Sequence, residues 1–160
     1  MHTAARLYVA QFATAEPLDV IELGSLNING GVRDLFPSAN YVGVDVVRGP
    51  GVDVVGDAAT WKPTSKADIV ICCEVFEHTR LWPKILTNIA AILKPGGRAI
   101  LTMAGPGRAP HSAKDGGHLR RGEFYRNIEP DALESGCIDA GLLDVKVDQF
   151  GEDVRGTGVR

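Results

Sequence analysis

The sequence predicts one α/β domain built on a doubly wound, mostly parallel sheet with helices on both faces. Three observations predict this fold. Short apolar, β-branched segments recur along the chain, segments with helical spacing lie between several of them, and the first five apolar segments are continuous runs rather than alternations. Continuous runs are typical of parallel strands that helices cover on both faces. Because 160 residues suit one domain, we assign residues 1–160 to a single unit.

Six segments have the length and composition of strands. They are residues 19–23, 41–46, 52–55, 68–73, 98–103 and 142–150. Only five residues, 47–51, lie between the second and third segments, and Arg48-Gly49-Pro50-Gly51 is the connector. Since a parallel crossover needs about a dozen residues, we expect residues 52–55 to form a short edge strand or to be merely extended. Residues 151–160 are polar and contain glycine, so they predict no further substantial strand.

Helical patterns fall between the strands. In residues 80–93, apolar side chains recur every three or four positions, and Lys94-Pro95-Gly96-Gly97 provides a stop signal. Residues 130–140, which Gly141 ends, form a second predicted helix, and residues 3–12 form a weaker third. Strands that alternate with helices predict the doubly wound sheet.

Composition excludes several classes of protein. The chain has 17 Lys and Arg against 20 Asp and Glu, a formal net charge of −3, which excludes a uniformly basic nucleic-acid binder. No apolar run approaches the roughly 18–20 residues of a membrane span. Three cysteines without CxxC spacing do not suit a secreted disulfide framework, so we predict a cytoplasmic protein. Cys72 and Cys73 point to opposite faces of a strand, so we expect core residues and no metal site.

Basic residues concentrate in one segment. Residues 98–126 contain six Lys or Arg but only two acidic residues, Asp115 and Glu123, so the local net charge is +4. This basic island also contains several Gly and Pro residues, which disfavour regular structure. It follows the fifth predicted strand, so it emerges at the carboxyl edge of the sheet. An anionic partner and a solvated flexible loop both remain open as explanations.

Polar residues follow successive predicted strands. The first strand leads into a turn rich in Gly and Asn, which lets the backbone approach a ligand closely. Asp45 stands at the end of the second strand, where a carboxylate can accept hydrogen bonds from ribose hydroxyls. Asp57 follows the third apolar run, and the fourth run ends in Cys73-Glu74-Val75-Phe76-Glu77-His78. Open α/β sheets bind ligands at this edge.

In their order and spacing, these segments resemble the class I S-adenosylmethionine-dependent methyltransferases, specifically the small ones with an E-V-x-E-H motif after the fourth strand. The matching segments are Glu22-x-Gly24, Val44-Asp45, Gly56-Asp57-Ala58, Glu74-Val75-Phe76-Glu77-His78 and Leu93-Lys94-Pro95-Gly96-Gly97. The resemblance implies a Rossmann-like methyltransferase fold that lacks or shortens its last strand, with S-adenosylmethionine as cofactor. It implies cofactor-binding roles for Glu22, Gly24, Ser25, Asn27, Asp45, Val46, Asp57, Ala58, Cys73 and Glu74.

Some positions keep two interpretations. Asp57 equally suits a cap for the turn at residues 58–61, and Glu77 and His78 either begin the following helix or line the acceptor pocket. Leu26 and Ile28 stand where the family's later glycines would be. We expect the neighbouring Asn27 and Asn29 to supply the left-handed conformation in their place.

These departures support a second hypothesis. The chain would then be a non-catalytic binding or scaffold protein on the same fold, with weakened cofactor affinity. A nicotinamide or nucleotide-sugar enzyme is a third possibility, which the absence of G-x-G-x-x-G in the first turn disfavours.

The acceptor side is predicted from the basic island. Guanidinium groups bind phosphate and carboxylate in a bidentate manner, so Arg108, Arg120, Arg121 and Arg126 favour a small anionic acceptor over nucleic acid or a membrane. We expect residues 105–126 to form a lid on that side. His78, His118 and Tyr125 are candidate catalytic residues. None is assigned as a base, because methyl transfer depends mainly on positioning.

Overall fold

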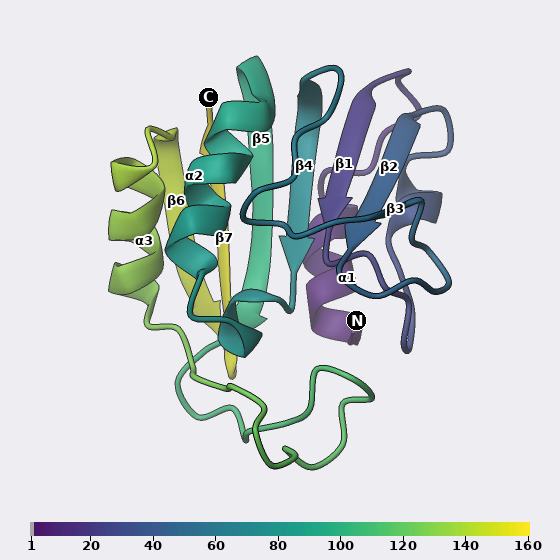
Figure 1. The fold of residues 1–160 in the computed structure, drawn as a ribbon. Helices are drawn as coiled ribbons and strands as arrows, with labels where there is room; N and C mark the ends of the chain where they lie inside the picture. Colours follow the sequence, from purple (N-terminus) through teal and green to yellow (C-terminus); the bar gives the residue numbers. More distant parts are fainter. Residues whose placement is uncertain (1) are drawn as a thin grey trace.

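The computed structural model describes residues 2–160. They form a seven-stranded sheet in the order β3-β2-β1-β4-β5-β7-β6, in which β7 runs in the direction opposite to the other six strands (Figure 1). The strands are β1 (Asp19–Leu23), β2 (Asn40–Asp45), β3 (Val54–Val55), β4 (Ala67–Cys73), β5 (Leu93–Ala104), β6 (Leu143–Phe150) and β7 (Asp153–Val159). The α-helices are α1 (Thr3–Ala10), α2 (Trp82–Ile92) and α3 (Pro130–Asp139), and short 3-10 turns occur at η1 (Arg33–Leu35) and η2 (Phe76–His78).

Helices cover both faces of the sheet, as the sequence predicts. In Figure 1, α2 and α3 lie in front of the sheet and α1 lies behind it. The front face buries the larger core, to which α2 contributes Ile85, Leu86 and Ile89. These residues are three or four positions apart, so they share one face of the helix. The core behind the sheet is smaller and contains Val9 from α1.

The edge beside β2 carries little helix. Residues 46–53 connect β2 to β3 without a helix. β3 itself spans only two residues, as expected for a short edge strand. Between β1 and β2, the chain forms only the three-residue η1. At the C-terminal end of α2, the predicted helix stop signal Lys94-Pro95-Gly96-Gly97 does not form a loop of its own but belongs to β5. Leu93 already pairs with Ala67, and a register shift absorbs the residues before Arg98.

The prediction that the last strand is short or absent is wrong. β7 pairs with both β5 and β6 over Asp153–Val159. Its sequence conceals it because Gly156 and Gly158 stand where apolar side chains would identify a strand. A Cβ on Gly156 would lie 3.1 Å from Leu133 Cδ2, and one on Gly158 would lie 3.0 Å from Leu142 Cβ. Glycine in a strand often marks such a close approach.

Cys72 and Cys73 are free and buried, so the prediction that they are core residues is confirmed, and Cys137 is likewise free and buried. Within residues 2–160, no helix has both the length and the apolar character needed to cross a bilayer.

Candidate active site

Two neighbouring cavities occupy the carboxyl edge of the sheet. The large cavity has a volume of about 720 Å³ and is lined by residues that follow β1, β2 and β4, among them Gly24, Asp45 and Val75. The small cavity has a volume of about 500 Å³ and lies against Glu74, Arg108 and several histidines. Ile28 and His78 line both cavities, so the two spaces adjoin each other.

Four of the predicted cofactor-binding residues line the large cavity: Gly24, Asp45, Val46 and Asp57. Asp45 is held in place by the backbone, since its Oδ2 accepts a hydrogen bond from Leu26 N at 3.2 Å and its Oδ1 accepts one from Val47 N at 2.9 Å. Asp57 caps a turn and is also part of the cavity wall. Its Oδ1 accepts a hydrogen bond from Ala59 N at 2.8 Å, which caps the turn, and the residue also faces the cavity.

The other predicted cofactor residues lie elsewhere. Glu74 lines the small cavity, whereas Glu22, Ser25, Asn27, Ala58 and Cys73 line neither cavity. Glu22 is buried in the sheet, where Tyr41 OH donates a hydrogen bond to its Oε2 at 2.8 Å. Burial raises the pKa of the Glu22 carboxyl. The hydrogen bond from Tyr41 means that the Glu22 side chain connects β1 to β2.

The turn after β1 differs from its predicted conformation. Between residues 2 and 160, the non-glycine residues with positive φ are Glu74 and Asp144, so the expectation of left-handed Asn27 and Asn29 is wrong. Gly24 and Gly30 carry the positive φ angles instead, at 84° and 121°. Asn27 has a different role, because its Oδ1 accepts a hydrogen bond from Gly30 N at 2.8 Å and closes the turn.

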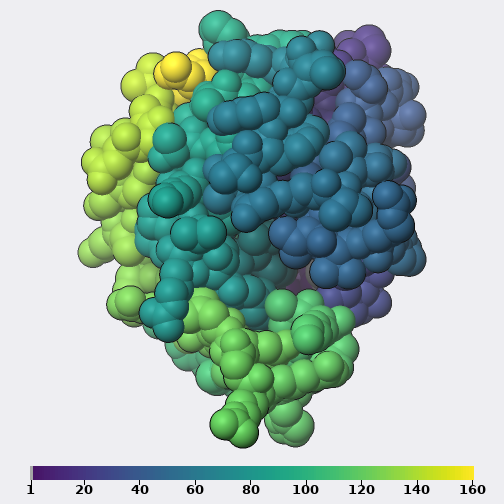
Figure 2. Space-filling model, viewed as in Figure 1, coloured from purple at the N-terminus to yellow at the C-terminus, as the bar shows by residue number. Residues whose placement is uncertain are grey.

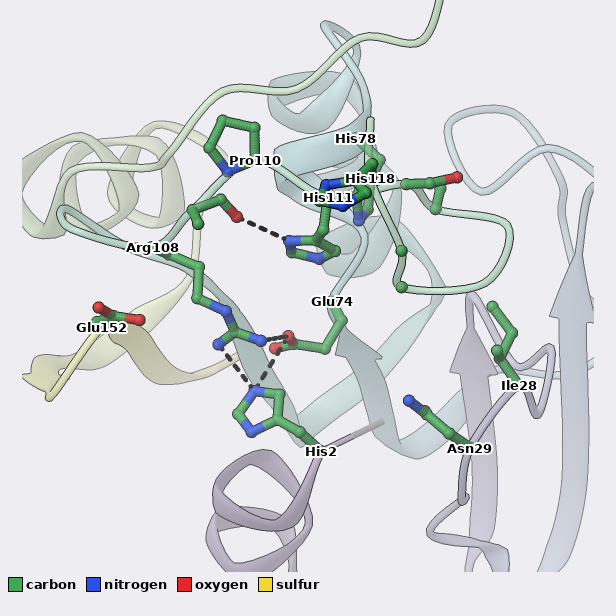
Figure 3. A pocket seen from close by; sticks show the side chains of 15 residues that line it. His2, Ile28, Asn29, Glu74, His78, Arg108, Pro110, His111, His118 and Glu152 are labelled. Carbon is green, nitrogen blue, oxygen red and sulfur yellow. Dashed lines mark hydrogen bonds and ion pairs between the residues drawn. The ribbon is translucent and has the colours of Figure 1, made fainter. Parts of the chain in front are cut away.

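An ion-pair network forms one wall of the small cavity (Figure 3). Glu74 lies 3.1 Å from His2 Nε2 and 3.6 Å from an Arg108 guanidinium nitrogen, and Asp153 pairs with the same two residues. Burial opposes ionisation of Glu74, yet its contacts with His2 and Arg108 keep the pKa of this carboxyl below its usual value. Glu74 also has a φ of 58°. A non-glycine residue in this conformation is often part of a functional site.

A second set of polar side chains lies next to the small cavity and consists of Glu77, His78, His111 and Tyr125. Glu77 is fully buried, and burial together with the charge of Glu74 raises its pKa to about 8. Burial lowers the pKa of His78 to about 4. The rings of His78, His111 and Tyr125 meet edge to face, with centroids 4.9 to 5.6 Å apart. His78 is the last residue of η2 and lines both cavities. It does not begin the following helix, because α2 starts only at Trp82.

The segment between β5 and α3 closes both cavities from below. Residues 105–129 have little regular structure, as expected, apart from a bridge between His111 and His118. Lys114 and Phe124 line the large cavity, and Arg108, His111 and His118 line the small one. Figure 2 shows this segment as a green surface at the lower end of the molecule, with a small hollow where it meets the blue surface.

The three predicted acceptor-binding arginines do not line either cavity. Arg120 pairs with Asp115, Arg121 is exposed, and the backbone N–H of Arg126 donates to Glu77 O at 2.9 Å. Of the basic island, Arg108 and Lys114 are the cations that face the cavities. Tyr125 also lies outside the walls, while the predicted His78 and His118 are part of them.

His2 and Val47 are among the wall residues that the sequence did not predict. His2 reaches the small cavity from the start of α1, far from every motif in the sequence. Val47 lies one residue beyond the predicted second strand and lines the large cavity. His2 is identified only by tertiary contacts, whereas its neighbour Arg108 was already part of the basic island.

Residues 5–147 match the protein family described as a methyltransferase domain. No protein of curated function gives a significant sequence match. The solved structure of a DhpI–SAH complex is 17% identical with a TM-score of 0.71, over 97% of this chain and 82% of that one.

Two further structures have the same fold. The 1,6-didemethyltoxoflavin-N1-methyltransferase of Burkholderia thailandensis, solved with 1,6-didemethyltoxoflavin and S-adenosylhomocysteine, is 16% identical with a TM-score of 0.72, over 98% of this chain and 78% of that one. The phosphoethanolamine N-methyltransferase 2 of Haemonchus contortus, solved with S-adenosyl-L-methionine, is 15% identical with a TM-score of 0.70. The match covers 98% of this chain but only 52% of that one, so the chain spans about half of this larger protein.

Proposed function

Because the chain belongs to the methyltransferase-domain family, we propose that it transfers the methyl group of S-adenosylmethionine to a small-molecule acceptor. The observation that carries this proposal is the pair of adjoining cavities at the carboxyl edge of the sheet, which share His78 and Ile28 in their walls. The large cavity would hold the cofactor and the small cavity the acceptor. Open α/β sheets bind their ligands at this edge.

The residues around the large cavity fit the cofactor. Its volume of about 720 Å³ lies within the range of roughly 300–1,000 Å³ that small-ligand pockets occupy. Its walls are largely apolar, with Leu26, Val46 and Ile85 among them, which suits an adenine ring. Asp45 stands at the end of β2, where a carboxylate can receive ribose hydroxyls. Each of its oxygens accepts one backbone hydrogen bond and retains a further lone pair for a ligand.

The acceptor's size and charge follow from the small cavity. About 500 Å³ suits a small molecule. Two of the solved proteins of this fold are named for small acceptors, didemethyltoxoflavin and phosphoethanolamine, and the second of these carries a phosphate. An anionic acceptor would be bound by Arg108 and Lys114, because the other predicted arginines do not line the cavities.

The chain's own contribution to the reaction is placement. S-adenosylmethionine, when bound, supplies an electrophilic methyl group on a positively charged sulfur. Asp45 would orient the cofactor through its ribose, and the 105–129 segment would exclude water from both cavities, since it lines each of them. Holding two reactants in line accounts for a large part of the barrier reduction in such a transfer.

Calorimetry with S-adenosylhomocysteine tests the proposal directly. We expect the wild-type chain to bind it, and Asp45→Ala to weaken binding by about 1–3 kcal/mol, or roughly 5- to 150-fold, because hydrogen bonds to a charged group are lost. Asp53→Ala is the matched control. Asp53 also accepts a backbone hydrogen bond, from Gly43 N at 2.7 Å, but lines neither cavity.

The alternative hypothesis, a non-catalytic scaffold protein on the same fold, predicts that the chain does not bind the cofactor. If the folded wild-type chain gives neither heat nor a thermal shift with S-adenosylmethionine or S-adenosylhomocysteine, the methyltransferase proposal fails. Equal affinity of the wild-type and Asp45→Ala chains would leave the activity in place but remove Asp45 from the cofactor site.

A further inference from the structure

Buried polar atoms without hydrogen-bond partners concentrate at one place in the molecule. Within residues 2–160 these atoms are Ser25 Oγ, Glu77 Oε2, His78 Nδ1 and Tyr125 OH. The last three belong to the group of side chains beneath the small cavity. Leaving a buried polar atom unpaired costs about 1–3 kcal/mol, and more for a charged group. Three such atoms in one cluster indicate that something else satisfies them.

The geometry of this cluster suits a metal ion. One ligand atom from each of Glu77, His78 and His111 lies within 4.8 Å of the others. Ligand bonds of about 2.0–2.2 Å place the ligand atoms of a tetrahedral ion about 3.3 Å apart, so modest side-chain rotations close the set. Figure 3 shows the rings of His78 and His111 next to each other at the edge of the small cavity.

Neighbouring backbone groups hold two of these side chains in position. Glu77 Oε1 accepts a hydrogen bond from Ala104 N at 3.2 Å, so Oε2 is the oxygen left free. His111 Nδ1 lies 3.2 Å from Ala109 O. A carbonyl can only accept, so Nδ1 carries the proton and Nε2 keeps a lone pair. Metal-binding histidines are fixed in this way by a hydrogen bond from their other ring nitrogen.

We propose that Glu77, His78 and His111 form a binding site for one divalent transition-metal ion at the junction of the two cavities. One carboxylate and two imidazoles suit Zn²⁺, Co²⁺, Mn²⁺ or Fe²⁺, whereas Mg²⁺ and Ca²⁺ prefer oxygen ligands alone. His78 and His111 line the small cavity, so an open coordination position would face the proposed acceptor. Tyr125 OH would then donate to a water or an acceptor oxygen on the ion.

A buried water is the physical rival to the ion, since water also satisfies clustered polar groups. The two differ in what the protein takes up from solution. Untagged protein is treated with a chelator and then titrated with Co²⁺, whose visible absorption reports nitrogen and oxygen ligands directly, and with Zn²⁺ by calorimetry. No cofactor is added, so the result does not depend on the proposed methyl transfer.

We expect one ion per chain, with Co²⁺ and Zn²⁺ bound in preference to Mg²⁺. Loss of an outer hydrogen-bond partner of a metal ligand weakens binding about 10- to 100-fold. Loss of a ligand itself in His111→Ala or His78→Ala should therefore weaken Zn²⁺ binding more than about 100-fold. Glu77→Gln should have a similar effect while keeping an acceptor for Ala104 N. His118→Ala is the control, because His118 lies on the same segment and lines the same cavity but is outside the ligand set.

Circular dichroism establishes that each variant is folded. His111 lies in the irregular segment rather than in the sheet, so its variant tests the site even if Glu77→Gln fails to fold. Absence of Co²⁺ absorption in the wild-type chain would overturn the proposal. So would undiminished Zn²⁺ affinity in His111→Ala, or an equal loss in His118→Ala.

Discussion

Gly24 shows how one residue at the site is constrained by the fold. It follows β1 with a φ of 84°, and a Cβ built there would lie 2.2 Å from Val75 Cγ2. Val75 lies in the connection after β4, one residue beyond Glu74. The turn that lines the large cavity and the E-V-x-E-H segment are therefore packed against each other at this residue.

We expect Gly24→Ala to lower the free energy of unfolding by roughly 2–5 kcal/mol, as left-handed strain and overpacking add. Val75→Ala removes the methyl group that collides, so the double variant should recover the overpacking part but not the strain. Urea unfolding of the two single variants and the double variant measures the coupling. Strict additivity of the two substitutions would show that the contact with Val75 is not what excludes a side chain here.

At the scale of elements, β7 depends on glycine for its contact with α3. The side chain of Leu133 occupies the space beside Gly156, where a strand residue would normally project. Valine favours strands and glycine does not, so propensity alone forecasts that Gly156→Val stabilises the protein. Because of the crowding, we expect the opposite, a loss of about 1–3 kcal/mol.

Chemical denaturation of Gly156→Val checks this expectation. Gly31→Val provides the control, since it makes the same change in the unfolded chain at a position where a Cβ would meet only Asn27 Nδ2, at 3.7 Å. A gain in stability at position 156 would mean that α3 shifts to accommodate the side chain.

Whether a strand or helix can be predicted from the sequence depends on whether its own side chains fill the core, as the contact between Gly156 and Leu133 illustrates. The core strands β1 and β4 and the helix α2 are recognisable because their own side chains form the core. β7 was missed because the apolar side chain that fills its face belongs to α3. The strand-end residues Gly24, Asp45 and Asp57 were predicted together because topology alone brings parallel strand ends to one edge. The pairing of Arg120 with Asp115 was not predicted, because it depends on the path of an irregular segment.

At the scale of the whole molecule, the two edges of the sheet have different roles. The carboxyl edge holds both cavities, whereas the amino edge carries a charge cluster that joins three strands. There Lys94 Nζ lies 2.7 Å from Asp19 Oδ2 and 2.8 Å from Asp68 Oδ2, and so connects β5 to β1 and β4. Substitutions at this edge should alter stability without altering ligand binding.

Lys94→Met tests this separation through the pH dependence of stability. The hydrogen bonds from Lys94 lower the pKa values of Asp19 and Asp68, and the two carboxylates raise the pKa of Lys94. A carboxyl whose pKa is lower in the folded chain stabilises the folded state at every pH above its pKa in the unfolded chain, about 3.9. This stabilisation is lost as the pH falls through the pKa of the carboxyl in the folded chain. We therefore expect Lys94→Met to be less stable than the wild type at pH 7, with the difference narrowing below about pH 4.

Urea unfolding at several pH values between neutral and acid measures this difference, with Lys84→Met as a control that removes the same charge from an exposed position on α2. A difference that stays constant down to strongly acid pH would show that the cluster does not stabilise the fold through the ionised carboxylates. S-adenosylhomocysteine affinity at neutral pH should be the same in Lys94→Met and the wild type, because Lys94 lines neither cavity. A loss of affinity there would mean that the amino edge of the sheet is coupled to the site at the opposite edge.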